Sequence, residues 1–563
     1  MNTIISNNNW WQKGVIYQIY PKSFQSTKNV QANALAIGDL QGIIQRLDYL
    51  KTLGVDGIWI TPIYPSPQVD NGYDIADYYD INPDYGTLDD FDELVTKAHQ
   101  KGIKIMLDMV FNHTSDKHFW FQQALDPNSE YRDFYIWKNG KDNNQSPPNN
   151  WRSKFGGGAW KWHEVSKQYY LHLFSENQPD LNWENSKVRA EIVKVCQFWI
   201  KRGVDALRLD VINLISKQQD FLDDLQGDGR RFYTDGPRVH EYLQELSTKV
   251  FQPNQTVTVG EMSSTTLDNC VKYANLDGKE LSMVFNFHHL KVDYPNGEKW
   301  CVAKPDFIEL KKIFSYWQQG MHNKAWPALF WCNHDQPRIA SRFGSEGQYH
   351  HVSATCWAMI LYGMQGTPYI YQGEEIGMLN PHFDSIKQYR DIESLNFYHE
   401  KIEHGLSEKE ILAILAQKSR DNSRTPMQWN DAAFAGFSQY TPWISVAKQY
   451  PSINVEKALA DKSSIFYFYQ MLIQLRKQYE ILILGDYQDL LPASNDLWIY
   501  QRQYQHAILT VVANLTDKKQ KMAHPIVIKE TTKIVCHNYS HPIKEMLTEL
   551  EPYQTLYLLN ELD

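Results

Sequence analysis

Residues 203–210 read Gly203-Val-Asp-Ala-Leu-Arg-Leu-Asp210, a short apolar run that ends in charged side chains. The run Ala206–Leu209 shows no clean alternation with polar residues, which is typical of a strand buried on both faces of a parallel sheet. Arg208 and Asp210 are two residues apart, so on a strand their side chains point to the same face. The stretch therefore predicts a buried strand that presents a guanidinium and a carboxylate together at its carboxyl end.

Seven further runs of this kind occur along the chain, and amphipathic stretches separate them. The expected strands are Val15–Tyr20, Gly57–Thr61, Lys104–Val110, Ala206–Leu209, Val257–Gly260, Ser282–Phe285, Ala328–Trp331 and Thr367–Tyr371. The expected helices include Leu88–Lys101, Lys187–Arg202, Pro237–Val250, Phe307–Gln319 and Val352–Tyr362. Buried strands joined by helical crossovers predict an α/β fold of the (β/α)8 TIM-barrel type, although a doubly wound sheet would fit the same pattern.

Two connections are longer than ordinary loops, and long insertions in compact domains are usually functional. Residues 114–182, after the third strand, predict an inserted domain, and residues 373–430 predict a second insertion after the eighth strand. From about Asp486, short alternating strands such as Leu497–Gln501 and Ile508–Val512 predict a C-terminal all-β sandwich domain. We therefore expect a barrel in two parts, 1–113 and 183–485, with an inserted domain at 114–182 and a β domain at 486–563.

The composition narrows the class of protein. The 563-residue chain has 42% hydrophobic and 22% charged residues, an ordinary globular composition, and no apolar run approaches the about 20 residues that a membrane helix needs. The net charge of −10 argues against a nucleic-acid partner, so an anionic substrate would need a local basic patch. Six scattered cysteines favour neither a disulfide framework nor a zinc site. The polar N-terminal residues do not resemble a secretory signal, and a cytoplasmic location is expected.

Polar residues follow the apolar runs at several strand ends. They are Asn112 and His113, Arg208 and Asp210, Glu261, and His334 and Asp335. Because the carboxyl ends of barrel strands converge on one face, these side chains together predict an active site. Two carboxylates on such a face suit cleavage of a glycosidic bond, in which one attacks the anomeric carbon or activates water and the other protonates the leaving oxygen.

The two acidic residues at successive strand ends differ in their expected protonation. Arg208 is expected to hold Asp210 ionised at neutral pH, as a nucleophile requires. Glu261 is the better general acid, since partial desolvation or a second carboxylate would let it keep its proton.

Four stretches resemble the signature regions of glycoside hydrolase family 13, the α-amylase family. They are Asp108-Met-Val-Phe-Asn-His113, Gly203-Val-Asp-Ala-Leu-Arg-Leu-Asp210, Thr258-Val-Gly-Glu261 and Phe330-Trp-Cys-Asn-His-Asp335. A fifth stretch, Gln178-Pro-Asp-Leu-Asn-Trp-Glu184, resembles the extra region of the oligo-1,6-glucosidase branch. The resemblance covers essentially the whole chain and implies a retaining α-glucoside hydrolase that needs no organic cofactor.

By this resemblance Asp210 is the nucleophile, Glu261 the acid/base, and Asp335 a third carboxylate that binds ring hydroxyls. The resemblance also implies a set of substrate-binding residues: Asp70, Tyr73, His113, Arg208, His334 and Arg424. Arg424, in Arg420-Asp-Asn-Ser-Arg-Thr-Pro-Met-Gln-Trp429, would close the pocket opposite Asp70, so that one terminal glucose is removed.

Within the branch, the stretch Phe285-Asn-Phe-His-His-Leu-Lys-Val-Asp-Tyr-Pro-Asn-Gly-Glu-Lys-Trp300 resembles members that hydrolyse trehalose 6-phosphate to glucose and glucose 6-phosphate. The implied partner is then a small phosphorylated disaccharide. Lys291 and Lys299 lie in this stretch, after the sixth strand, and we expect both to bind the phosphate. The expected helpers are His288, His289, Arg230 and Arg231.

The segment Ser26–Asp39 corresponds to the place where many relatives bind calcium, but it carries one carboxylate and a lysine, so no metal is expected there. Three alternatives for the function stay open. The first is an oligo-1,6-glucosidase or dextran glucosidase acting on neutral isomalto-oligosaccharides. The second is a barrel that binds a sugar or a protein without catalysis, and the third is a transglycosylase or sugar isomerase.

Overall fold

The structure is a computed structural model that describes residues 9–29, 34–540 and 545–561. Within these residues, eight parallel strands form one sheet in the order β10-β11-β1-β2-β3-β7-β8-β9. The strands are β1 (Ile16–Ile19), β2 (Gly57–Ile60), β3 (Lys104–Val110), β7 (Ala206–Asp210), β8 (Val257–Met262), β9 (Met283–Asn286), β10 (Ala328–Leu329) and β11 (Thr367–Tyr371). A parallel bridge between Val284 and Pro327 joins the two ends of this order and nearly closes the sheet. The predicted TIM barrel is confirmed, and the doubly wound alternative is wrong.

The strand ends carry the residues on which the site prediction depends. β7 runs one residue further than expected and ends on Asp210, and β8 includes Glu261. β10 is shorter than the expected strand Ala328–Trp331. The polar residues that follow the strands therefore lie at one rim of the barrel.

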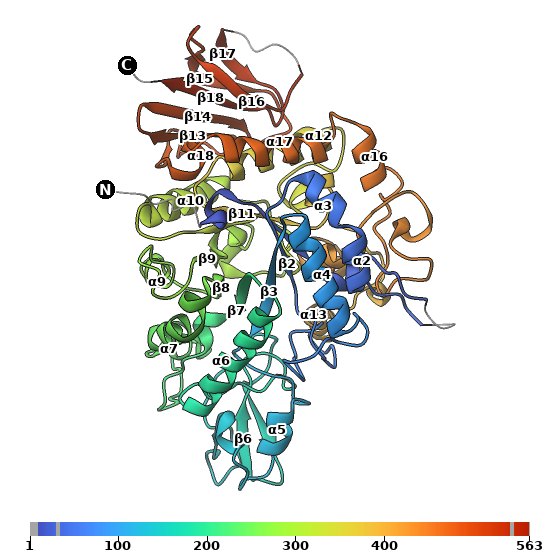
Figure 1. Ribbon diagram of the computed structural model, residues 1–563, viewed down its shortest axis with the longest axis vertical. Coiled ribbons are helices and arrows are strands. Elements are labelled where there is room, and N and C mark those ends of the chain that lie inside the picture. Colours follow the sequence, from blue (N-terminus) through green and yellow to red (C-terminus); the bar gives the residue numbers. More distant parts are fainter. Residues whose placement is uncertain (1–8, 30–33, 541–544, 562–563) are drawn as a thin grey trace.

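Helices surround the barrel (Figure 1), and several match their expected ranges to within a few residues. They include α4 (Leu88–Gln100), α6 (Ser186–Lys201), α10 (Phe307–Met321) and α12 (His350–Tyr362). α4 begins with a capping box, in which Thr87 accepts the backbone N–H of Asp90 and the Asp90 carboxylate accepts the N–H of Thr87. The expected helix Pro237–Val250 is instead α7 (Val239–Leu246) followed by a π-helical segment, Ser247–Phe251.

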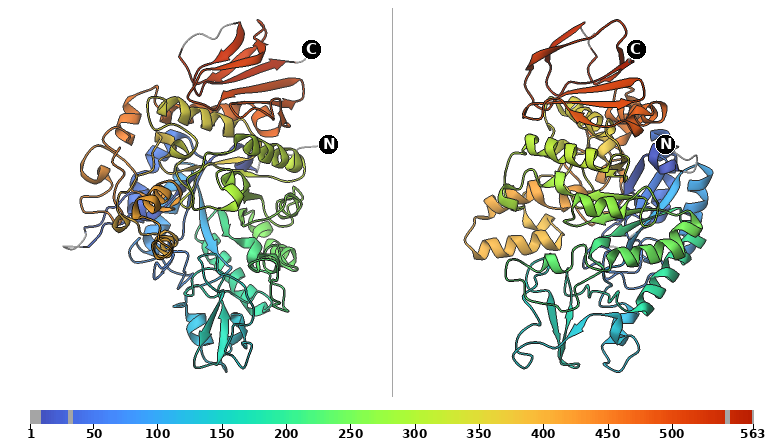
Figure 2. Two further views of the ribbon diagram at one scale, coloured as in Figure 1. Left: turned by 180° about the vertical axis from the view of Figure 1, so that it is seen from behind. Right: turned by 90° about the vertical axis from the view of Figure 1, so that its left-hand side faces the viewer.

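The segment after β3 forms a small antiparallel sheet in the order β4-β6-β5. Its strands are β4 (Trp137–Lys138), β6 (Gln168–Leu171) and β5 (Trp160–His163). A bridge between His113 and Asp180 returns the end of this segment to the end of β3. This sheet and the C-terminal strands lie at opposite ends of the barrel in each view (Figures 1 and 2).

The C-terminal strands form two antiparallel sheets within the described residues. One contains β12 (Gln488–Asp489), β13 (Leu497–Tyr504), β14 (Ala507–Asn514), β18 (Thr555–Glu561) and β16 (Lys533–His537), and the other contains β15 (Gln520–Val527) and β17 (Met546–Leu550). Leu497 and Ile499 face an apolar cluster shared with the second sheet, whereas Tyr500 faces the barrel and its hydroxyl donates to the Ile360 carbonyl of α12 at 2.8 Å. The alternation along β13 thus supports the predicted sandwich.

The segment after β11 contains α13 (Ile392–Glu403), α14 (Glu408–Lys418) and the short α15 (Asp421–Arg424). Gly405, with a φ of 86°, lies between α13 and α14 and allows the chain to turn there. The exact domain boundaries stay predictions. No helix of the described residues is long and apolar enough to cross a membrane, and the cytoplasmic location also stays a prediction.

Packing of α6 on the barrel can be tested at Trp199. Its side chain is fully buried, its indole N–H donates to the Tyr78 carbonyl at 2.8 Å, and its ring contacts Phe91 and Tyr64 at centroid distances of 5.1 and 5.4 Å. Trp199→Ala should lower the free energy of unfolding by about 3–5 kcal/mol in urea titrations, because it leaves a cavity. Phe198→Ala, on the half-exposed neighbouring position, is the control and should cost markedly less. Equal losses in the two variants would contradict this packing.

Candidate active site

A cavity of about 320 Å³ lies at the carboxyl ends of the barrel strands. Its lining includes most of the residues predicted from the sequence: Asp70, Tyr73, His113, Asp210, Glu261, Lys291, Lys299 and Asp335. Three other predicted residues are almost completely buried and are not part of this lining: Arg208, His334 and Arg424. The structure therefore brings the predicted site together, with part of it in a supporting layer.

Arg208 is the centre of that supporting layer. Its NH1 group lies 2.8 Å from Asp108 Oδ1 and 2.6 Å from Asp210 Oδ1, and its NH2 group contacts Glu261. The guanidinium is 2% exposed. One buried cation thus spans three carboxylates from β3, β7 and β8, which places Asp210 and Glu261 side by side.

One positive charge shared among three carboxylates does not keep all of them ionised. Burial raises the pKa of Asp108 to about 6, against the effect of Arg208. Burial also raises the pKa of Asp210; Arg208 lowers it, and the charges of Glu261 and Asp108 raise it again, so that the net direction is upward. Arg208 lowers the pKa of Asp210 as expected, but burial and the two neighbouring carboxylates outweigh it, so Arg208 alone does not hold Asp210 ionised.

An aromatic stack forms one wall of the site. The rings of Tyr73 and His334 are nearly parallel, at an angle of 4° and a centroid distance of 5.2 Å. The Tyr73 hydroxyl donates to Asp108 Oδ2 at 2.9 Å, and Gln18 Nε2 donates to His334 Nδ1 at 2.7 Å. Burial lowers the pKa of His334 to about 3 and that of His113 to about 4. Both imidazoles are therefore neutral at pH 7 and suited to hydrogen bonds with uncharged hydroxyls.

The pocket is closed at Asp70 by a different arginine from the one expected. Arg420 NH2 lies 3.4 Å from Asp70 Oδ1, and Arg420 lines the cavity. Arg424 instead lies beneath Asp335, with its NH2 group 2.5 Å from Asp335 Oδ1. The prediction that Arg424 lies opposite Asp70 is wrong, because Arg424 is at the end of α15, where it donates to the His334 carbonyl at 2.8 Å and is held below the cavity floor.

Arg420 and Arg424 also set the charge of Asp335. Burial raises the pKa of Asp335, but His334 and the two guanidinium groups outweigh burial and hold that pKa well below its usual range. Asp335 is therefore a permanent anion at neutral pH. Arg420 and Arg424 both lie in the motif Arg420–Trp429, so the sequence pointed to an arginine of this motif. Only the fold shows that Arg420 is the one beside Asp70.

The basic residues predicted to bind phosphate differ in their surroundings. Lys299 Nζ forms an ion pair with Glu393 Oε2 at 2.6 Å, whereas Lys291 makes no ion pair with any described carboxylate. Of the expected helpers only Arg230 lines the cavity. His289 is buried against Phe330, and Arg231 pairs with Asp224 at 3.0 Å.

Lys154, from the inserted segment, lines the same cavity and was not expected from the sequence. Burial, followed by the charge of Arg230, lowers its pKa to about 8. No motif surrounds Lys154, and its place in the site depends on how the inserted segment folds over the barrel. His288, a further expected helper, packs against Trp317 at a centroid distance of 5.2 Å and does not line the cavity.

The segment expected to lack calcium is described only in part, because residues 30–33 lie outside the described residues. Asp39 caps α2 (Leu40–Gln45), accepting the Gly42 N–H at 2.8 Å, and also accepts the Thr27 N–H at 2.7 Å. No cluster of three or more metal-ligating side chains occurs in the part of the chain that the structure describes.

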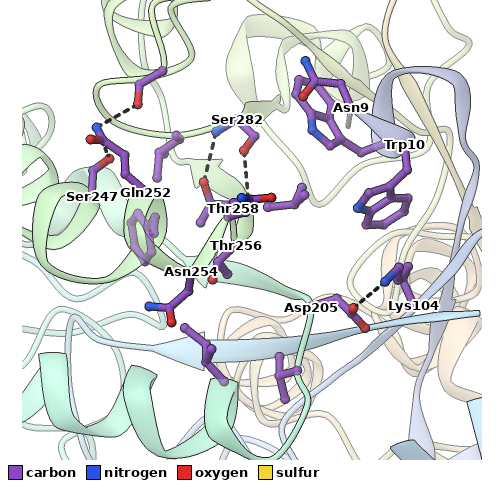
Figure 3. A pocket seen from close by; sticks show the side chains of 18 of the residues that line it. Asn9, Trp10, Lys104, Asp205, Ser247, Gln252, Asn254, Thr256, Thr258 and Ser282 are labelled. Carbon is purple, nitrogen blue, oxygen red and sulfur yellow. Dashed lines mark hydrogen bonds and ion pairs between the residues drawn. The ribbon is translucent and has the colours of Figure 1, made fainter. Parts of the chain in front are cut away.

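A larger hollow of about 1030 Å³ lies at the opposite end of the barrel (Figure 3). It is lined by residues at the amino ends of strands, such as Lys104, Asp205 and Ser282. Its polar groups are largely paired with one another: Lys104 lies 2.8 Å from Asp205, and Ser282 and Thr258 exchange hydrogen bonds between hydroxyl and backbone N–H groups (Figure 3). It therefore lacks the converging carboxylates of the smaller cavity, and barrel enzymes place their chemistry at the other face.

Comparison with known proteins agrees with this geometry. The family model described as the alpha amylase catalytic domain matches residues 18–485. The chain belongs to the α-amylase family. A trehalose-6-phosphate hydrolase of Escherichia coli (strain K12) is 61% identical over 98% of this chain and 99% of the relative, and an oligo-1,6-glucosidase of Bacillus cereus is 44% identical over 97% and 98%. The crystal structure of a trehalose-6-phosphate hydrolase from Bacillus licheniformis superposes with a TM-score of 0.92 at 52% identity, covering 98% of this chain and 100% of that one. The resemblance to this family of glycoside hydrolases, and to its oligo-1,6-glucosidase branch, is confirmed.

Asp108 offers a test of how neighbouring charge sets the pKa of Asp210. Its negative charge is one cause of the raised pKa of Asp210, and it competes with Asp210 and Glu261 for Arg208. Asp108→Asn removes that charge, so Asp210 should lose its proton at lower pH. Because a carboxylate nucleophile must be ionised, the acidic limb of a kcat/KM profile should move to lower pH, while Asp89→Asn, at an exposed position on α4, should leave the profile unchanged. An acidic limb that stays in place or moves upward would contradict this arrangement.

Proposed function

We propose that this protein hydrolyses trehalose 6-phosphate to glucose and glucose 6-phosphate, with retention of the α configuration. The observation that carries the proposal is one cavity in which Asp210 and Glu261, held together by Arg208, lie with Lys291, a cation that pairs with no carboxylate of the described residues. The Asp70–Arg420 pair closes one end, which suits a terminal glucose, and Lys291 and Arg230 line the cavity as well. The high identity to relatives named for this reaction supports the same assignment.

The first step is displacement at the anomeric carbon. Asp210 attacks as the carboxylate, the glycosidic C–O bond breaks, and Glu261 gives its proton to the bridging oxygen as glucose 6-phosphate leaves. Arg208 spans both carboxylates with one guanidinium, which supports the separation of about 5–5.5 Å that a retaining pair requires. The product of this step is a β-glucosyl ester on Asp210.

The second step returns the enzyme to its starting state. Glu261, now a carboxylate, takes a proton from water as the water oxygen attacks the anomeric carbon and the bond to Asp210 breaks. Two inversions at the same carbon release glucose in the α configuration. A single proton therefore passes from Glu261 to the leaving sugar and is replaced from water.

Residues around the glucose ring supply orientation and charge. Asp335 is held ionised by Arg420 and Arg424, so it can bind ring hydroxyls and stabilise positive charge that develops at the anomeric carbon. Asp70 and Arg420 provide an acceptor and a donor for the terminal hydroxyls. The neutral imidazoles of His113 and His334 add hydrogen bonds without adding charge.

The chain has a net charge of −10, so binding of a phosphate requires a local cluster of positive charge. Lys291 and Lys299 line the cavity and are proposed to bind it. The Lys299–Glu393 pair removes part of that positive charge, and this is the observation that favours the alternative of a neutral isomalto-oligosaccharide. The two proposals share every residue that acts on the glucose ring and differ only on the leaving-group side.

Substrate comparison tests the proposal directly. Glucose release should be at least about tenfold faster in kcat/KM from trehalose 6-phosphate than from trehalose or isomaltose, because charge-assisted contacts to phosphate are worth about 1.5–3 kcal/mol. Asp210→Asn should abolish release from all three and serves as the blank. A preference for isomaltose would overturn the assignment in favour of the neutral oligosaccharide and leave the two-step mechanism standing.

The effect of the two lysines on phosphate binding can be measured separately from effects on the rest of the site. Lys291→Ala should raise KM for trehalose 6-phosphate with kcat little changed and should spare hydrolysis of p-nitrophenyl α-glucoside. Lys299→Ala should have a smaller effect, since Glu393 already neutralises Lys299. Equal losses on the phosphorylated and neutral substrates in the Lys291 variant would show that Lys291 acts only on the structure of the site.

A further inference from the structure

We infer that Lys154, on the inserted segment, is a further specificity-determining residue that binds the phosphate of the leaving sugar together with Arg230 and Lys291. This inference rests on the proposed hydrolysis of a phosphorylated disaccharide and names the group that the inserted segment contributes to it. Lys154 lies in none of the stretches that relate the chain to its family, so its assignment depends on the geometry alone.

Lys154 lies on the leaving-group side of the cavity. Its Nζ donates to Ser263 Oγ at 3.0 Å, and Ser263 follows the acid Glu261 by two residues at the end of β8. The opposite side is defined by Asp70 and Arg420, which close the pocket for the terminal glucose. A sugar whose bridging oxygen faces Glu261 therefore extends toward Lys154.

The backbone holds Lys154 in place. Its N–H donates to the Leu173 carbonyl at 2.8 Å, and the flanking Ser153 N–H donates to the Gly157 carbonyl at 3.1 Å. The next residue, Phe155, packs under the Arg420 guanidinium at 5.2 Å from its ring centroid. The side chain thus enters the cavity from an anchored loop, which lowers the entropy lost when it binds a ligand.

Three cations from three separate segments meet at this rim: Lys154 from the inserted segment, Arg230 after β7 and Lys291 after β9. Lys154 and Lys291 form no ion pair with a carboxylate of the described chain. Arg230 pairs with Asp228 at 2.9 Å, where both side chains are partly exposed. Burial is the largest cause of the lowered pKa of Lys154; Arg230 and Lys291 lower it further, whereas Asp228 and Glu261 raise it.

A like-charged cluster of this kind is unfavourable until an anion joins it. A phosphate monoester carries a charge of about −1.5 to −2 at pH 7 and has oxygens that accept several donors at once. Asp228 already offsets one of the three positive charges, so the phosphate matches the charge that remains, and its oxygens can accept from all three cations. Lys299 differs, since Glu393 already supplies its counter-charge.

The test compares Lys154→Met, which keeps most of the length of the side chain and removes the charge, with Lys154→Arg, which keeps a charge. Lys141→Met is the matched control: Lys141 is also on the inserted segment, pairs with Asp223 and does not line the cavity. Each variant is assayed with trehalose 6-phosphate, with p-nitrophenyl α-glucoside, and with inorganic phosphate as an inhibitor of the aryl glucoside reaction.

Lys154→Met should raise KM for trehalose 6-phosphate about tenfold or more, the loss expected for one charge-assisted contact. It should leave kcat/KM for the aryl glucoside within about twofold of wild type and weaken inhibition by phosphate, and Lys154→Arg should recover much of both losses. Lys141→Met should resemble wild type in every assay.

Two outcomes would overturn the inference. Equal losses on both substrates in Lys154→Met would mean that Lys154 supports the Ser263 strand end only. Unchanged KM and unchanged phosphate inhibition would mean that Lys154 does not contact the anion. Failure of the proposed function is distinguishable from both, because wild type itself would then show no preference for the phosphorylated substrate.

Discussion

The buried Arg208 guanidinium is the interaction on which the site depends. It contacts Asp108, Asp210 and Glu261 and so ties the ends of β3, β7 and β8 to one another. A buried cation without these partners would be strongly destabilising, and three carboxylates without it would repel one another. Because one positive charge faces three acids, Arg208 does not offset the effect of burial on Asp108 and Asp210, and the pKa of each is raised. In the proposed mechanism the same guanidinium that joins the strand ends also aligns the nucleophile with the acid.

Charge is divided between the two ends of the cavity. At the glucose end, Asp70, Arg420, Asp335 and Arg424 form alternating ion pairs, so the pocket offers fixed donors and acceptors with little net charge. At the leaving-group end, cations gather without full compensation. The first end suits a neutral hexose and the second suits an anion. Each insertion contributes to one of these ends. The segment after β11 carries Arg420, at the glucose end, and the segment after β3 carries Lys154, at the leaving-group end.

Most of the fold was predictable because strands and helices of a barrel leave local patterns. The eight apolar runs became the eight strands, and α4 begins at the capping signal of Thr87. The carboxylates of the proposed active site were predictable for the same reason, since parallel strands place their carboxyl ends on one rim and polar residues there stand out. The errors fell on irregular segments. Arg420 and Arg424 are four residues apart in one motif, and nothing local shows which of them faces Asp70; of the four expected helpers only Arg230 reaches the cavity.

The sequence by itself determined the barrel, its inserted and C-terminal β segments, and the identity of the acids at the strand ends, because strand and helix periodicity and strand-end position are local properties of the chain. Tertiary structure decided the raised pKa of Asp210, the position of Arg420 and not Arg424 beside Asp70, the pairing of Lys299 with Glu393, and the place of Lys154 in the cavity. Each of these depends on burial and on charges brought from distant segments. Electrostatic energy depends on the distance between charges in space, and the distance between two residues along the chain does not determine that separation.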